Sequence, residues 1–169
     1  MGNSTLDSAA MSSSARRLSE RWLALALLYF VLAVALGVAM GTTHDFRLRG
    51  VHVHLNLLGW VSMSLMGLVL RVVPAAAEGR LAAVQFWLYQ LALPAAMTGL
   101  AGLLLGHSAF VPLSAAGSVA VALAVLLFAV AVWRALARAW FRAETPATGG
   151  GSLVSPALAP AAAARTPAA

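Results

Sequence analysis

Long apolar stretches, separated by short polar segments, dominate this chain. Each stretch is long enough to form a helix across the ~30 Å of hydrocarbon in a bilayer, which takes ~20 residues. They lie at residues 22–40, 51–73, 81–105 and 110–132. The connections are short, so successive helices should run antiparallel. The pattern therefore predicts an all-α membrane protein, a four-transmembrane-helix up-down bundle.

The polar ends of the chain set the domain boundaries. Residues 1–20 are rich in serine and are predicted to be a disordered cytoplasmic leader. Residues 21–142 form the predicted four-helix transmembrane domain, whose last turns carry arginine and tryptophan into the headgroup zone. Residues 143–169 are rich in alanine and proline and are predicted to be a disordered tail.

Composition supports a lipid environment. Apolar residues make up 62% of the chain and charged residues 9%, whereas soluble domains have about 45–50% and 25%. The net charge of +6 comes from arginines that flank the apolar stretches, so we expect the lipid bilayer as partner and no nucleic acid. The chain has no cysteine, which excludes thiolate-ligated zinc, iron–sulfur clusters and disulfides.

Arginine bias in the connecting segments predicts the orientation. Two arginines, Arg47 and Arg49, lie in the loop after the first span. Eight lie on the other side: Arg16, Arg17, Arg21, Arg71, Arg80, Arg134, Arg138 and Arg142. We therefore expect an integral membrane protein with both termini cytoplasmic, in a bacterial inner membrane.

The predicted topology places all four histidines at one end of the bundle. His44 and His107 fall in the two outer loops, and His52 and His54 begin the second helix. At ~100° per residue, His52 and His54 point in nearly opposite directions. His52 shares its face with a small and polar stripe suited to helix–helix contact, which contains Asn56, Gly59, Met63 and Gly67. His54 shares its face with apolar residues that suit lipid or a flat macrocycle.

The start of the second helix resembles a known family. The segment His54-Leu55-Asn56-Leu57-Leu58, followed by Trp60, Gly67, Val73-Pro74 and Glu78, is similar to a helix of the haem–copper oxidase superfamily. The resemblance is closest to subunit I of nitric oxide reductases and of cbb3-type cytochrome oxidases. In that family such a helix supplies an axial ligand of a low-spin haem b.

The resemblance implies a haem-b-binding protein, oxidase subunit I-like, in electron transfer, gas sensing or haem handling. By it, His54 is the haem ligand and Asn56 a nearby orienting group. His107 is the expected second ligand, because it lies on the same side at the end of the next helix, and His52 is the alternate. The chain lacks the further helices and histidines of a complete oxidase subunit, so we do not expect it to be a complete enzyme alone.

Arg47 and Arg49 lie where haem propionates at the outer surface would need cationic partners. An ordinary polar loop is the alternative interpretation of both residues.

Two other hypotheses remain open from the sequence. A nitrogen-rich copper site, in a copper-binding assembly factor, would use histidine ligands. Its candidate ligands are His44, His52, His54 and His107. Alternatively, the chain is a non-catalytic subunit or scaffold of a larger respiratory complex, or forms a homo-oligomer.

Overall fold

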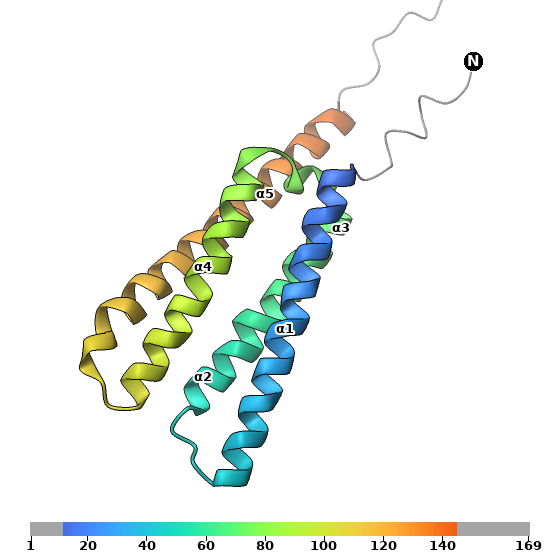
Figure 1. Ribbon diagram of the computed structural model, residues 1–169. Coiled ribbons are helices and arrows are strands. Elements are labelled where there is room, and N and C mark those ends of the chain that lie inside the picture. Colours follow the sequence, from blue (N-terminus) through green and yellow to red (C-terminus); the bar gives the residue numbers. More distant parts are fainter. Residues whose placement is uncertain (1–11, 145–169) are drawn as a thin grey trace, which may run out of the picture.

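The computed structural model describes residues 12–144 and shows an all-α bundle in that part of the chain (Figure 1). Four helical segments are long and apolar enough to span a membrane. They are Ser13–Thr43, Arg49–Val72, Gly79–Leu104 and Ser108–Arg142. The predicted fold class and the four predicted spans are therefore confirmed.

The first span starts earlier than its hydropathy predicts. Helix α1 (Ser13–Thr43) is capped by Ser12, whose hydroxyl accepts a hydrogen bond from the Ala15 amide at 3.2 Å. Arg16 and Glu20 form an ion pair one turn apart on its exposed face. Residues 13–20 are thus helical, whereas we had predicted disorder there, because capping and surface ion pairs stabilise a polar turn that hydropathy does not detect. Residues 1–11 and 145–169 lie outside the described residues.

The second span is built from three consecutive helical segments. Helix α2 (Arg49–His54) passes into the π-helix η2 (Leu55–Ser62) and then into α3 (Met63–Val72). The span ends before Pro74, as predicted, and the 3₁₀ turn η3 (Pro74–Ala77) leads to α4 (Gly79–Leu104). A second 3₁₀ turn, η4 (Ser108–Phe110), precedes α5 (Val111–Glu144). A π-helix of eight residues is long, since most are single turns, and π-helices often lie at functional sites.

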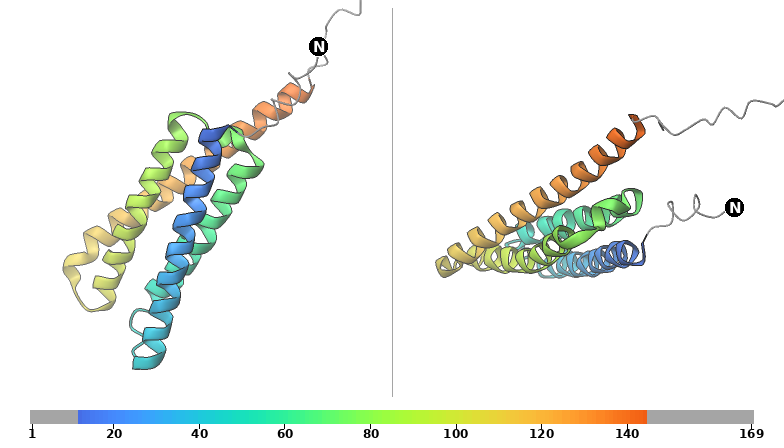
Figure 2. Two further views of the ribbon diagram at one scale, coloured as in Figure 1. Left: turned by 45° about the vertical axis from the view of Figure 1, so that its right-hand side comes forward. Right: turned by 90° about the horizontal axis from the view of Figure 1, so that it is seen from above.

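The bundle consists of two helical hairpins, which Figures 1 and 2 show from three directions. The first hairpin pairs α1 with the second span, and the second pairs α4 with α5. Glycines allow close approach in each: a Cβ at Gly59 would lie 2.7 Å from the Tyr29 side chain, and one at Gly117 would lie 2.5 Å from the Ala96 amide nitrogen. Gly59, Met63 and Gly67 are buried, so the predicted small-residue stripe is confirmed as a helix–helix contact.

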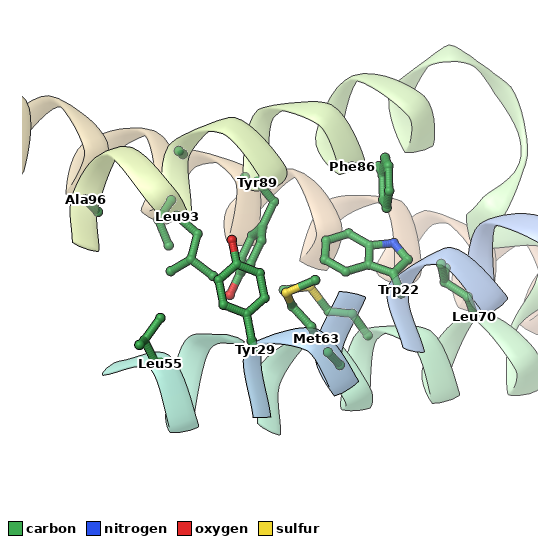
Figure 3. Packing of buried hydrophobic residues seen from close by; sticks show 14 of the residues in the cluster. Trp22, Tyr29, Leu55, Met63, Leu70, Phe86, Tyr89, Leu93 and Ala96 are labelled. Atoms are coloured by element: carbon green, nitrogen blue, oxygen red, sulfur yellow. The ribbon is translucent and has the colours of Figure 1, made fainter. Parts of the chain in front are cut away.

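Aromatic side chains join the two hairpins (Figure 3). Trp22 of α1 is fully buried and makes edge-on contacts with Phe86 and Tyr89 of α4, with ring centroids 5.1 and 5.3 Å apart. The Tyr89 hydroxyl donates a 2.9 Å hydrogen bond to the Leu58 carbonyl in the π-helix. This contact also gives the second hairpin a polar attachment to the first.

The bundle has two distinct ends. The termini end holds the start of α1, the turn η3 and the end of α5, and the loop end holds the segments 44–48 and 105–110 (Figure 1). The two ends of the described chain therefore lie on the same side of the bundle. Large apolar side chains are exposed along the outer faces of all four long helices, as a bilayer environment requires.

Candidate functional site

The four histidines all lie toward the loop end, but they do not form one cluster. His44 ends α1, the pair His52 and His54 lies in α2, and His107 lies between α4 and η4. Among residues 12–144, no group of three or more His, Cys, Asp or Glu side chains could hold a metal ion. The geometry thus gives no support to the four-histidine copper site.

His52 packs inside the first hairpin. Its Nδ1 donates a 2.9 Å hydrogen bond to the Ala33 carbonyl of α1, which fixes the proton on that nitrogen in the neutral ring. The ring fills the space left by the missing side chain of Gly37, where a Cβ would lie 2.9 Å from the ring Cε1. Asn56 approaches the other ring nitrogen, with its Nδ2 3.4 Å from Nε2. Both ring nitrogens of His52 therefore have partners within its own hairpin.

Asn56 lies beside His52 rather than His54. Its Nδ2 donates to the His52 carbonyl at 2.9 Å, in addition to the longer contact with the His52 ring. The resemblance implied an orienting role for Asn56 toward His54, and no hydrogen bond between these two side chains is present. The amide instead holds the ring of the histidine that faces α1.

His54 faces away from α1, and its ring is oriented by the backbone. The Nδ1–H donates a 2.7 Å hydrogen bond to the Gly50 carbonyl one turn earlier. A neutral imidazole with its proton on Nδ1 keeps a lone pair on Nε2. His54 is exposed and lies near residues of α4 and α5, whereas His52 contacts α1, as the 100° helical period predicted.

His54 lines a cavity between the two hairpins at the loop end, with a volume of about 260 Å³. Leu58 and Met97 supply apolar walls from η2 and α4, and Ser114 and Ser118 face it from α5. The two serines are one turn apart on the fourth span, a spacing visible in the sequence. We had not predicted them as site residues, because nothing in the sequence shows that this face of α5 meets α2.

His107 and His44 are loop residues. His107 is exposed at the tip of the second hairpin, near Phe110, and does not line the cavity beside His54. His44 adopts a left-handed backbone conformation, with φ of 54°, and ends α1. A residue in this conformation at a helix C-terminus satisfies the turn geometry, so His44 has a clear structural role.

The two loop arginines differ in their partners. Arg47 forms a tight ion pair with Asp45, with Nη2 and Oδ2 2.6 Å apart. Hydrogen bonds from Arg47 lower the pKa of Asp45 to about 2 and in turn raise the pKa of the guanidinium. Arg49 forms no ion pair with any described residue. Of the two arginines predicted to meet propionates, Arg49 is thus the one with a free guanidinium.

The site brought together by the fold is therefore small. It contains one histidine with an oriented ring, apolar walls from three helices and two serine hydroxyls. No protein-family model, no curated protein and no solved structure matches this chain.

Proposed function

We propose that this chain is an integral membrane protein that binds haem b between its two hairpins, and that Nε2 of His54 would hold the haem iron. The observation that carries the proposal is the hydrogen bond from His54 Nδ1 to the Gly50 carbonyl, 2.7 Å long. Metal-binding histidines almost always donate their second ring N–H to such an acceptor, which fixes the tautomer and directs the lone pair.

The surroundings of His54 favour it over His52 for this role. The ring of His52 is held between Ala33 and Asn56 inside the first hairpin, and freeing it would break both contacts. The ring of His54 lines a cavity whose walls are mostly apolar, as a haem macrocycle requires.

The cavity offers a haem iron one side-chain ligand, the imidazole of His54. The cavity volume of about 260 Å³ is just below the ~300–1,000 Å³ of typical ligand pockets, so binding of a whole macrocycle requires the hairpins to move apart at the loop end. Bound haem would supply one-electron transfer or reversible binding of a small gas. His107 lies outside the cavity, so we propose a single protein ligand, which favours gas sensing or haem handling over electron transfer through two fixed histidines.

The loop residues would contribute at the edge of the site. Arg49 has no ion pair in the described part of the chain. It is the first residue of α2 and lies five residues before His54. A guanidinium at this position would be available to pair with a haem propionate. Arg47 already has its carboxylate partner in Asp45.

The test is an absorption spectrum, dithionite-reduced minus oxidised, of the full chain purified in detergent from haem-replete cells. We expect a sharp b-type α-band in the wild-type protein and in His107→Ala, an exposed loop histidine outside the cavity that serves as the matched control. His54→Gly should lose the band and regain it when free imidazole is added, because imidazole can replace the deleted ligand in the space that it leaves.

Each other result has a defined meaning. A wild-type preparation without the band would overturn the haem proposal, and so would a band that His54→Gly retains without imidazole. Loss of the band in His52→Ala alone would assign the ligand to the other histidine of α2. Stoichiometric copper in a colourless preparation would favour the copper-binding hypothesis instead, and partner binding that survives replacement of all four histidines would favour the scaffold.

A further inference from the structure

A second cavity, at the termini end, is lined by arginine. It lies between the turn η3, the start of α4 and the last third of α5, and it has a volume of about 160 Å³. Arg80 of α4 and Arg134 and Arg138 of α5 all line it. Since Arg134 and Arg138 are four residues apart on one helix, their side chains leave α5 on the same face.

Within residues 12–144, no carboxylate pairs with these arginines. The ion pairs among residues 12–144 are Arg16–Glu20 and Arg47–Asp45, so none of the three guanidiniums has a carboxylate within 4.0 Å. Glu78 also lines the cavity but pairs with none of them. Three cations against one anion leave an excess of positive charge, and like charges held around one small space repel each other unless an anion enters.

The backbone adds hydrogen-bond donors at the same place. Helix α4 begins at Gly79, on the wall of the cavity, and its N-cap residue Glu78 makes no side-chain capping bond. The first amides of this helix of 26 residues therefore have no intrahelical acceptor, and the helix dipole favours negative charge at this end.

We propose that this cavity binds a phosphate group. Three guanidiniums match the several oxygens of a phosphate better than a single carboxylate does, because each can donate two parallel hydrogen bonds. The phosphate could come from an anionic phospholipid or from free phosphate. The position favours the lipid: Arg134 follows the fourth apolar stretch directly, beside the exposed Trp133, and therefore at the depth of the lipid headgroups.

The experiment uses the full chain in detergent and measures binding by calorimetry. Three probes separate the sources of phosphate: short-chain phosphatidylglycerol, short-chain phosphatidylcholine and inorganic phosphate. We expect phosphatidylglycerol to bind more tightly than phosphatidylcholine, and the double variant Arg134→Gln/Arg138→Gln to bind it about tenfold more weakly, since two charge-assisted contacts are lost.

A matched control separates a defined site from diffuse attraction. Arg17→Gln/Arg21→Gln removes the same charge at the same end of the bundle, also from two residues four apart on one helix, but neither lines the cavity. It should change the affinity less than twofold if the contacts are local. The variant Arg134→Lys/Arg138→Lys keeps both charges but loses the paired donors of each guanidinium, so it should bind less tightly than the wild type and more tightly than the glutamine variant. Such an intermediate affinity would show that the glutamine variant fails through lost charge rather than through misfolding.

Each outcome of this experiment either supports the phosphate site or overturns it. Binding of inorganic phosphate as tight as that of phosphatidylglycerol, and sensitive to the same two arginines, supports the site and assigns it to free phosphate. Equal losses in the two glutamine variants, equal affinity for the two lipids, or no binding of any probe would overturn the proposal. None of these results depends on haem, so the site can stand or fail separately from the proposed function.

Discussion

Replacement of Gly37 by alanine tests how His52 is held in the first hairpin. The added Cβ would lie 2.9 Å from Cε1 and 3.3 Å from Nδ1 of the His52 ring, well inside the ~3.5–4.0 Å at which carbon atoms pack best. The ring must therefore move, and its 2.9 Å hydrogen bond to the Ala33 carbonyl is strained or lost.

The expected magnitude follows from three contributions. Loss of an interhelical hydrogen bond within a membrane costs about 0.6–2 kcal/mol, and overpacking costs about 1–3 kcal/mol. The higher helix propensity of alanine returns up to about 1 kcal/mol. Together these contributions should make Gly37→Ala lower the free energy of unfolding by about 1–4 kcal/mol.

The assay is an equilibrium unfolding titration in mixed micelles of mild detergent and dodecyl sulfate, followed by circular dichroism. The decisive comparison is made in the His52→Ala background, where no ring occupies the space. There Gly37→Ala should be neutral or stabilising by up to about 1 kcal/mol. The double-mutant cycle of Gly37→Ala and His52→Ala should therefore give a coupling of about 2–5 kcal/mol. Gly41→Ala, one turn further along α1, is the matched control, because a Cβ added there would meet no atom of another described segment within 4 Å.

Two results would refute this reasoning. If Gly37→Ala destabilises the protein equally with and without the His52 ring, the added methyl group meets something else. If Gly37→Ala changes the free energy of unfolding no more than Gly41→Ala does, the His52 ring does not occupy the space beside Gly37. The hydrogen bond from that ring to α1 would then not hold the ring in place.

Three further predictions concern other contacts. Gly117→Ala should cost about 2 kcal/mol or more in the same titration, because the new Cβ would meet the backbone nitrogen of Ala96 at 2.5 Å and backbone cannot yield as a side chain can. Tyr89→Phe should cost about 0.6–1.5 kcal/mol through loss of its 2.9 Å bond to a π-helical carbonyl, and a normal melting curve would contradict that contact. Asp45, whose pKa is lowered to about 2 by Arg47, should contribute stability above its ordinary pKa and lose it as the pH falls through about 2; carbon NMR of its carboxyl group should show the pKa rising in Arg47→Gln.

Hydropathy and helical periodicity predicted much of the fold. Four spans, the break before Pro74 and the glycine-lined stripe below His52 all follow from where apolar and small residues fall along the chain. The separation of His52 and His54 onto opposite faces also follows from the period alone. These features are local, or nearly so, and a sequence encodes them directly.

The remaining features depend on contacts between distant residues. The π-helix lies in a stretch of ordinary apolar residues, and its Leu58 carbonyl is bonded by a tyrosine 31 residues away. The cavity beside His54 needs Ser114 and Ser118 from the last helix. Nor does composition reveal which arginines remain unpaired, as the contrast between Arg47 and Arg49 illustrates.

The arrangement as two hairpins has a consequence for how the protein is made. The partners of the His52 ring lie in the first two spans, so this polar side chain can be satisfied in the lipid before the third span has left the ribosome. The Tyr89 hydroxyl then attaches the second pair of spans to the first. Insertion can thus proceed two spans at a time, and the wall of α4 and α5 opposite His54 arrives last. Docking of the α4–α5 hairpin is therefore the step that decides whether a ligand of His54 is enclosed in the bundle or excluded from it.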